Sequence, residues 1–303
     1  MYAKIKSVGA SYNLGLSPDP MGWTQPQFGP QSSVSVLPCH PDFAAEPSQQ
    51  ACVLKMKGIN KSFGTQKVLS SLDFELVEGQ TTVVLGPSGC GKSVMLKHII
   101  GLIRPDAGEI WFQDKRIDRL SERELKWVRL QIGLLFQLSA LFDSMTVRQN
   151  LEFPLDEHMN LADSQRRDKV EEALDMVDML GSEHKLPAQL SGGQKKRVAL
   201  ARAIITKPSV ILYDEPTTGL DPMRAKGIDE LIVRLKERLG VTSLVVTHDL
   251  VSARRVADRI VMMDQGSIVA HGSFEQLRES KNAFVARFFA DAGSAAYAPR
   301  MNA

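Results

Sequence analysis

Long apolar runs are missing from this sequence, since no segment approaches the roughly 18 consecutive apolar residues that a membrane-spanning helix requires. Cysteine is also scarce: Cys39, Cys52 and Cys90 fit neither a metal-binding spacing nor a disulfide framework. The net charge of +2 predicts no strongly basic face of the kind that binds nucleic acid. We therefore expect a cytoplasmic protein that binds no nucleic acid and reaches a membrane only through a partner.

Charged residues are nearly absent from the first 50 positions, which hold only five of them but 7 of the 15 prolines. Ser, Gln, Gly and Pro dominate there, without a helical or strand period. The segment also lacks the continuous apolar core of a signal peptide. We expect residues 1–51 to form a disordered tail, or translation to begin at Met21 or later. Residues 291–303 show no clear pattern and are predicted to form a C-terminal tail.

From Cys52 onward, the hydrophobic pattern becomes that of a folded α/β domain. Residues 53–59 and 72–76 alternate apolar with polar side chains, which is typical of half-exposed strands. Residues 81–85 form a continuous run rich in β-branched side chains, which indicates a buried parallel strand. Because predicted helices alternate with further strands, we expect an α/β sheet with helices on both faces. Those further strands are predicted at residues 132–136, 209–213, 242–246 and 259–263.

The segment between Gln137 and Leu190 shows no convincing strand pattern. Helical stretches occupy it, and the clearest runs over residues 163–180. We therefore expect residues 138–190 to form a separate helical lobe.

One loop matches the phosphate-binding pattern G-x-x-x-x-G-K-[ST]. It lies between the strand at residues 81–85 and a predicted helix at 92–103, which is the context that this motif needs. Its glycines let backbone N–H groups approach phosphate oxygens, and the helix N-terminus favours negative charge. We expect Lys92 to bridge the β- and γ-phosphates and Ser93 to coordinate Mg²⁺. The loop consists of Gly86, Pro87, Ser88, Gly89, Cys90, Gly91, Lys92 and Ser93.

Two carboxylates, Asp214 and Glu215, end another buried strand. By themselves they are an ordinary acidic strand end. Beside a phosphate loop, however, they supply the carboxylate that Mg²⁺ needs and a base for an attacking water. Gln137 and His248 also follow apolar strands, and a histidine in such a place can equally be structural.

Two interpretations fit the segment Ser191-Gly192-Gly193-Gln194. As S-x-x-Q it is a capping box that opens a helix. Its two glycines cost about 1 kcal/mol each relative to alanine in a helix, but they would let a phosphate approach the helix N-terminus closely. We interpret the basic run Lys195-Lys196-Arg197 that follows as a solvated helix face rather than a nucleic-acid patch.

The order of these motifs resembles the ATP-binding cassette (ABC) family over residues 52–290. This resemblance implies an α/β fold with a P-loop NTPase (RecA-like) core, an antiparallel β subdomain and an inserted α-helical lobe. It also implies hydrolysis of ATP with Mg²⁺ as cofactor. The active form would be a dimer, in which one copy closes over the ATP bound to the other through Ser191, Gly192, Gly193 and Gln194.

The same resemblance implies roles for single residues. Asp214 would organise Mg²⁺, Glu215 would activate the attacking water, and His248 would sense the γ-phosphate. Gln137 would contact both Mg²⁺ and that water. Phe63 would stack on adenine, although a phenylalanine there can equally belong to the core.

Residues 93–102 and 133–155 resemble the ATPase of Mce/Mla-type lipid transporters, although Gln194 stands where that branch is expected to carry Met. This resemblance implies an ATPase for phospholipid transport, bound to a permease dimer at the cytoplasmic face of the inner membrane. An Mce-domain lipid-binding protein would be a further partner. The alternatives are the ATPase of an importer for a small polar solute and a non-transport ABC ATPase.

Two apolar clusters are candidates for contacts with partners. The first either forms a docking groove for the permease or belongs to the core of the helical lobe; it consists of Leu138, Leu141, Phe142, Met145 and Phe153. The second lies on one face of a short helix and either packs on its own domain or contacts the neighbouring ATPase; it consists of Phe284, Val285, Phe288 and Phe289.

Overall fold

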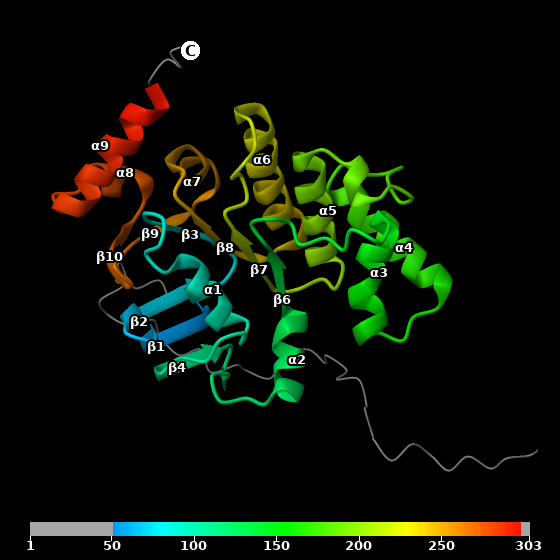
Figure 1. Cartoon of the computed structure of the whole chain (residues 1–303), viewed down its shortest axis with the longest axis horizontal. Helices are drawn as coiled ribbons and strands as arrows, with labels where there is room; N and C mark the ends of the chain where they lie inside the picture. Colours follow the sequence, from blue (N-terminus) through cyan, green and yellow to red (C-terminus); the bar gives the residue numbers. More distant parts are fainter. Residues whose placement is uncertain (1–50, 298–303) are drawn as a thin grey trace, which may run out of the picture. The chain divides into compact units, whose positions relative to one another are not determined.

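The computed structural model describes residues 51–297, with side chains described through residue 291. The predicted N-terminal tail, apart from Ala51, therefore lies outside the described residues, as do residues 298–303. The described chain contains a six-stranded sheet of order β10-β9-β3-β8-β7-β6 and a four-stranded sheet of order β2-β1-β4-β5 (Figure 1). Within residues 51–297, no helix has the length and apolar character needed to cross a membrane.

The six-stranded sheet contains the predicted parallel strands. Strands β6, β7, β8, β3 and β9 pair in parallel, while β10 pairs antiparallel with β9 at one edge. All of β3 and β8 is buried, as expected for the central strands of a covered sheet. The sequence pattern does not predict β10, because its residues are only partly buried and do not alternate. The strands are β3 (Thr81–Leu85), β6 (Ile132–Leu135), β7 (Val210–Asp214), β8 (Thr242–Thr247), β9 (Arg259–Asp264) and β10 (Ser267–Gly272).

The four-stranded sheet is antiparallel, and its first two strands are longer than the sequence pattern predicts. β1 (Cys52–Phe63) and β2 (Gln66–Val77) form a hairpin whose turn contains a glycine with positive φ. β4 (Ala107–Phe112) pairs with β1, and the short β5 (Lys115–Arg116) pairs with β4. The sequence pattern does not indicate β4 and β5, because glycine and charged residues interrupt their apolar positions.

Helices alternate with the strands of the larger sheet, so the predicted α/β class is confirmed. The longer helices are α2 (Glu122–Gln131), α3 (Val147–His158), α4 (Asp163–Met176), α5 (Gly192–Ile204), α6 (Pro222–Leu239) and α9 (Ala283–Tyr297). The shorter ones are α1 (Lys92–Ile99), η2 (Pro187–Gln189), α7 (Leu250–Val256) and α8 (Phe274–Arg278). Helix α9 extends through residues 291–297, for which the sequence showed no pattern.

Helix α1 is shorter than the predicted helix over residues 92–103. Gly101 has φ 65°, a left-handed conformation that ends the helix at Ile99. The Gly101 N–H donates to the His98 carbonyl at 3.1 Å, and the Leu102 N–H donates to the Lys97 carbonyl at 2.9 Å. This pair of bonds is a Schellman motif, so glycine stops the helix before Pro105 does.

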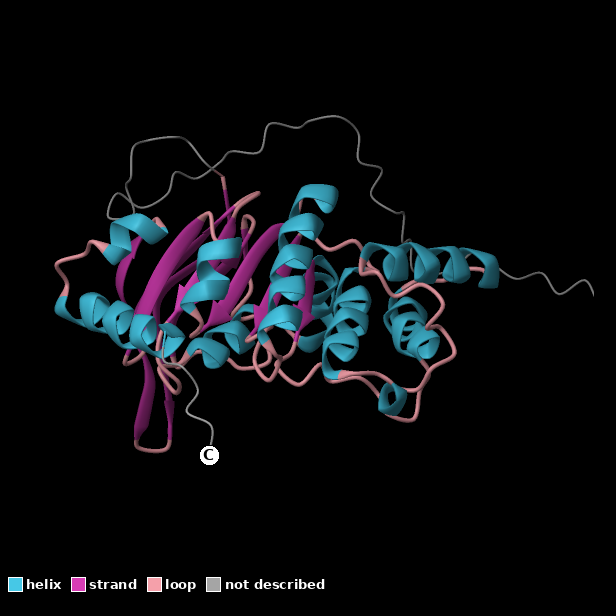
Figure 2. Ribbon diagram, turned by 90° about the horizontal axis from the view of Figure 1, so that it is seen from above, coloured by secondary structure: helices cyan, strands magenta, loops and turns pink. Residues whose placement is uncertain are grey.

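The two faces of the six-stranded sheet pack against different layers (Figure 2). Side chains alternate along a strand, so Val83 and Val84 of β3 belong to separate hydrophobic clusters. The cluster of Val83 includes side chains of α3 to α9, and that of Val84 includes side chains of β1, β2, β4, α1 and α2. The loops that follow β3, β6, β7 and β8 meet at the carboxyl edge of the sheet, where α/β proteins commonly bind ligands.

Helices α3 and α4 occupy the segment predicted as a helical lobe, and the structure describes no strand between Gln137 and Leu190. Both helices pack on α5 (Figure 1). Asp178, just after α4, lies 2.6 Å from the guanidinium of Arg197 on α5 and 2.6 Å from that of Arg234 on α6. These charges hold the pKa of Asp178 below its usual range despite partial desolvation, so the ion pairs link α4 to the sheet-covering helices.

Candidate nucleotide-binding site

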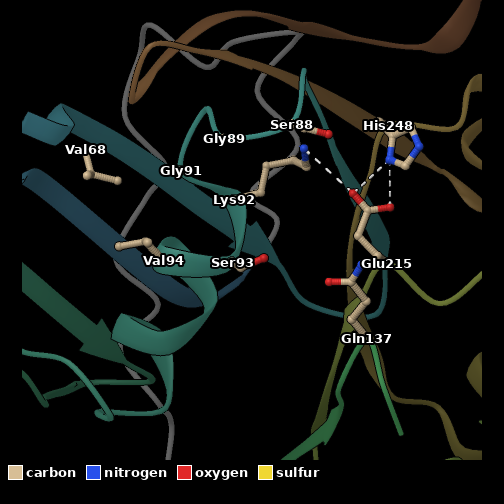
Figure 3. Close-up of a pocket in the computed structure, with 10 residues that line it drawn as sticks. All are labelled: Val68, Ser88, Gly89, Gly91, Lys92, Ser93, Val94, Gln137, Glu215 and His248. Carbon is tan, nitrogen blue, oxygen red and sulfur yellow. Dashed lines mark hydrogen bonds and ion pairs between the residues drawn. The ribbon is translucent and has the colours of Figure 1, made fainter. Parts of the chain in front are cut away.

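A cavity of about 360 Å³ opens at the carboxyl edge of the six-stranded sheet (Figure 3). Its walls come from the loop between β3 and α1, the start of α1, and the residues that follow β6, β7 and β8. Every lining residue except Val68 and Val94 belongs to the predicted site. The full lining is Val68, Ser88, Gly89, Gly91, Lys92, Ser93, Val94, Gln137, Glu215 and His248.

The glycines of the phosphate loop are required by its backbone and by its close neighbours. Gly91 has φ 110°, and a Cβ there would lie 2.9 Å from side-chain atoms of Leu69 and Met263. At Gly86, a Cβ would lie 2.2 Å from the carbonyl oxygen of Met263. These contacts arise because β2 and the end of β9 pack directly against the loop. Glycine therefore permits both the turn and the close packing.

Three of the predicted loop residues do not line the cavity: Gly86, Pro87 and Cys90. Gly86 and Pro87 contribute through their carbonyls, which accept hydrogen bonds from the Lys92 ammonium at 2.8 Å and 3.0 Å. Cys90 has a free thiol that is buried, and this burial raises its pKa above the ordinary value. These three residues therefore support the loop and do not form its open face.

Glu215 lies between the side chains of Lys92 and His248 (Figure 3). It is 8% exposed, and its Oε1 lies 3.8 Å from the Lys92 Nζ and 3.1 Å from the His248 Nδ1. Hydroxyls of Thr218 and Thr247 donate to Oε2 at 3.1 Å and 3.4 Å. The carboxylate is therefore held in one orientation at the edge of the cavity.

The backbone of Glu215 is strained. Its φ of 47° places a non-glycine residue in the left-handed region, which costs on the order of 1–3 kcal/mol. The Glu215 N–H donates to the Val246 carbonyl at 2.9 Å, and its own carbonyl accepts from the Thr218 N–H at 3.3 Å. Such strain persists only where surrounding contacts enforce it, and it is common at functional sites.

Oxygen ligands suited to a divalent cation lie beside this carboxylate. The Ser93 hydroxyl donates to Asp214 Oδ1 at 2.9 Å, and burial raises the pKa of Asp214 above its usual value. The Gln137 side chain lines the same cavity. Among the described residues no three His, Cys, Asp or Glu side chains form a metal cage. Mg²⁺ does not need such a cage, because it usually takes one or two protein ligands together with phosphates and water.

The segment Ser191–Gln194 lies away from this cavity. It forms the predicted capping box: the Ser191 hydroxyl accepts from the Gln194 N–H at 3.4 Å, and Gln194 Oε1 accepts from the Ser191 N–H at 2.9 Å. Of its residues, Gly192 is exposed, whereas Ser191, Gly193 and Gln194 line a second cavity of about 500 Å³. None of the residues lining this second cavity lines the first.

Phe63, the predicted adenine contact, lies at the end of β1 and is 48% exposed. Its ring does not line the cavity; instead the Lys61 ammonium lies 5.5 Å from the ring centroid. Val68, on the paired strand β2, is the apolar residue of this hairpin that lines the cavity. No sequence motif marks Val68, because only the folding of β2 over the loop brings it there.

The interpretation of Lys195-Lys196-Arg197 as a solvated face is wrong for Lys196. Lys196 is 5% exposed, and Arg197 donates to the Asp178 carboxylate at 2.6 Å and to the Val177 carbonyl at 2.8 Å. Helix α5 packs on the sheet, α3, α4 and α6, so most of its circumference is covered. Three consecutive helical positions span more than half a turn and cannot all face the remaining solvent-exposed stripe.

Comparisons with known proteins agree with the geometry. A protein-family model described as ABC transporter matches residues 69–218. A probable ribonucleotide transport ATP-binding protein, mkl, of Mycobacterium leprae is 41% identical over 78% of this chain and 68% of its own length. The intermembrane phospholipid transport system ATP-binding protein MlaF of Haemophilus influenzae is 39% identical over 78% of this chain and 89% of its own length.

Other relatives carry different names, including an Fe(3+) ion import ATP-binding protein of Mannheimia succiniciproducens, 37% identical over 78% of this chain and 66% of its own length. Among solved structures, a dimeric ATP-binding cassette in a post-hydrolysis state with ADP and phosphate superposes with a TM-score of 0.68. It is 34% identical and covers 73% of this chain and 98% of its own.

Proposed function

This chain belongs to the ABC transporter family of ATP-binding subunits and is an ATP hydrolase, and we propose from this that it drives phospholipid transport through a partner permease. One observation carries the catalytic part of the proposal. The buried Glu215 carboxylate lies between Lys92 and His248, at the wall of a cavity that a phosphate loop floors. That arrangement suits a base placed beside a bound terminal phosphate.

In the proposed reaction, the phosphates of ATP lie on the loop backbone and the N-terminus of α1. Lys92, now bonded to the carbonyls of Gly86 and Pro87, exchanges these bonds for phosphate oxygens. Glu215 accepts a proton from the attacking water. His248, within hydrogen-bond distance of that carboxylate, orients it and contacts the γ-phosphate.

The oxygen ligands present fit Mg²⁺. Ser93 and Asp214 would hold the ion, with Gln137 beside it, because these are the hard oxygen donors at the cavity. Bound Mg²⁺ supplies positive charge that neutralises the phosphates during transfer. Ser93 and Asp214 already lie in hydrogen-bond contact, so little rearrangement is needed to ligate the ion.

We propose that the active species is a dimer of this chain. The phosphate loop and the capping box Ser191–Gln194 line two separate cavities on one chain, so neither cavity holds both motifs. A second copy in antiparallel orientation would bring its capping box over the phosphate loop of the first. The exposed Gly192 and the bare N-terminus of α5 suit a phosphate supplied from another chain.

An apolar surface beside Gln137 is the proposed docking site for the permease. The side chain of Leu138 is 90% exposed, and Phe142 and Phe153 are 41% and 39% exposed with ring centroids 4.9 Å apart. Leu141 instead packs against the core. Because the surface directly follows Gln137, a partner bound there would be coupled to the nucleotide cavity. We propose that the chain is held at the inner membrane in this way.

The relative named for phospholipid transport supports the lipid cargo, and an Mce-domain lipid-binding protein is the proposed further partner. The relative named for Fe(3+) ion import favours a second candidate, an importer for a small polar solute. Both functions use the same ATPase chemistry and differ only in the permease.

The catalytic proposal is tested with Glu215→Gln, which keeps the shape of the side chain but removes the base. We expect kcat to fall by about 10²–10⁴-fold, while the ATP dissociation constant changes only a few-fold. Glu230→Gln is the matched control, because Glu230 lies exposed on α6, 3.6 Å from Lys226, outside the cavity. Unchanged turnover in Glu215→Gln would refute the assigned base.

The cargo is tested by purifying the tagged full-length chain in mild detergent and identifying bound proteins and lipids. A multi-span permease with an Mce-domain protein and phospholipid supports lipid transport. A permease with a soluble solute-binding protein would assign the chain to solute import. Ribosomes or DNA without any membrane protein would contradict both transport functions.

A further inference from the structure

Lys196 is a buried lysine whose ammonium reaches two peptides of the nucleotide site. Its Nζ donates to the carbonyl oxygen of Gln137 at 2.9 Å and to that of Glu215 at 3.3 Å. The side chain is 5% exposed and does not line the nucleotide cavity. Lys196 therefore contacts the backbone of both residues, and the side chains of those two residues line the cavity (Figure 3).

A buried ammonium needs compensation, because removing the charge from water is costly. Desolvation lowers the pKa of Lys196, whereas the nearby carboxylates of Glu215 and Asp214 favour its charged form. An apolar side chain at this core-facing position of α5 would avoid the desolvation cost. The lysine therefore supplies what an apolar residue cannot, which is a pair of hydrogen bonds to the carbonyls of Gln137 and Glu215.

The carbonyl of Glu215 belongs to a peptide that needs external support. Glu215 has φ 47°; its N–H donates a hydrogen bond to the Val246 carbonyl, and its carbonyl also accepts one from the Thr218 N–H. The Lys196 ammonium adds a charge-assisted hydrogen bond, which is roughly twice as strong as a neutral one. It also reaches the peptide of Gln137, which is 59 residues away in the chain.

We propose that Lys196 is a positioning residue for ATP hydrolysis, which holds the backbone of Glu215 and of Gln137 so that both side chains meet the bound nucleotide. The inference rests on the proposed roles of those two residues. Because α5 begins at Gly192 of the capping box, one rigid helix bears both Lys196 and the segment that meets the second copy. A displacement of α5 therefore reaches Glu215 and Gln137 directly.

The test compares Lys196→Met with Lys195→Met in the full-length chain. Methionine preserves the length and packing of the buried side chain but donates no hydrogen bond. Lys195 is the matched control, because its ammonium makes no hydrogen bond or ion pair with any other residue that the structure describes. The measurements are kcat and KM for Mg-ATP, and the dissociation constant of ATP.

We expect Lys196→Met to lower kcat by about tenfold to a hundredfold, the loss that one or two charged hydrogen bonds represent. The ATP dissociation constant is expected to stay within about threefold, because Lys196 does not reach the cavity. Lys196→Gln, whose amide can still donate, is expected to recover most of the lost kcat. If Lys196 had only a structural role, its substitution would lower the melting temperature but would not lower kcat selectively while leaving the ATP dissociation constant unchanged.

Wild-type kcat in Lys196→Met, or a loss in Lys196→Gln as large as that in Lys196→Met, would overturn the inference. If Lys196→Met also unfolds at the assay temperature, the Gln variant alone decides, by comparison with Lys195→Gln. Glu215→Gln in the same assay separates the two proposals. A drop in Glu215→Gln without one in Lys196→Met refutes only the positioning role, whereas normal turnover in Glu215→Gln refutes the function on which that role rests.

Discussion

Gly91→Ala is expected to destabilise the chain more than the same substitution at a glycine that has open space around it. Gly91 has φ 110°, and an added Cβ would lie 2.9 Å from Leu69 Cδ2, 2.9 Å from Met263 Cε and 3.1 Å from the Val68 carbonyl oxygen. By contrast, Gly240 at the end of α6 has φ 63° with nothing within 4 Å of the added Cβ. The two positions separate backbone strain from steric overlap.

The magnitude follows from these two terms. Left-handed backbone costs an alanine about 1–2 kcal/mol, and the lower entropy of the unfolded alanine chain offsets about 0.4–1 kcal/mol of that. Overpacking at Gly91 adds about 1–3 kcal/mol. We therefore expect the free energy of unfolding to fall by about 0.5–1 kcal/mol in Gly240→Ala and by about 2–4 kcal/mol in Gly91→Ala. The melting temperatures should fall by roughly 1–4 °C and 4–16 °C, respectively.

The assay is thermal and urea unfolding followed by circular dichroism, with and without Mg-ATP. Because Gly91 directly precedes Lys92 and α1, Gly91→Ala should also lose most of the stabilisation that ATP provides. Gly240→Ala should keep it, since it lies outside the cavity. Equal destabilisation by the two substitutions, or an unchanged response of Gly91→Ala to ATP, would refute this account of the loop.

Two further predictions concern polar groups that are fully buried. Asn150 is 0% exposed; its Nδ2 lies within 3.1 Å of the carbonyls of Phe142, Met145 and Thr146, and its Oδ1 accepts from the Phe142 N–H at 2.8 Å. Asn150→Ala is expected to lower the free energy of unfolding by about 2–4 kcal/mol, and a loss below about 1 kcal/mol in urea unfolding would contradict this role. Asp229 is 1% exposed, and burial raises its pKa above 3.8 although Ser252 and Arg255 donate to it. The Asp229 carboxyl therefore binds a proton more tightly in the folded state than in the unfolded state. Its contribution to stability is fully present below the pKa of the unfolded state and is lost as the pH rises through the pKa of the folded state. Relative to Asp229→Asn, the wild type should lose urea resistance as the pH rises above the ordinary aspartate pKa of about 4, and a difference between the two that does not change with pH would show that the pKa is not raised.

Most of the predicted site residues that line the cavity belong to short segments whose pattern involves only neighbours in the chain. A phosphate loop needs its glycines, lysine and serine at fixed spacing between a strand and a helix, so the pattern can be identified from the sequence alone. The same holds for Glu215 and His248, which directly follow buried strands. In a parallel sheet the carboxyl ends of strands meet at one edge, and thus strand ends alone predict that these side chains gather.

Other features depend on pairs that are far apart in the sequence. Helix α5 illustrates this, because its basic run looks solvated until α5 is packed on the sheet and on its neighbouring helices. Lys196 then reaches the peptides of Gln137 and Glu215, 59 and 19 residues away. Val68 becomes part of the cavity only because β2 lies over the phosphate loop. The edge strand β10 is not predicted, because all of its residues are partly buried and its sequence does not alternate between apolar and polar side chains.

The sequence by itself determined the α/β class, the phosphate loop and the candidate catalytic groups, because each is encoded by local spacing and hydrophobic period. Only the tertiary structure decided which charges are buried, and that the phosphate loop and the capping box line different cavities. Both are outcomes of packing, in which burial depends on which elements cover a helix and not on the helix's own composition. The phosphate loop and the capping box therefore line separate cavities of one chain, which is the arrangement that the proposed dimer needs.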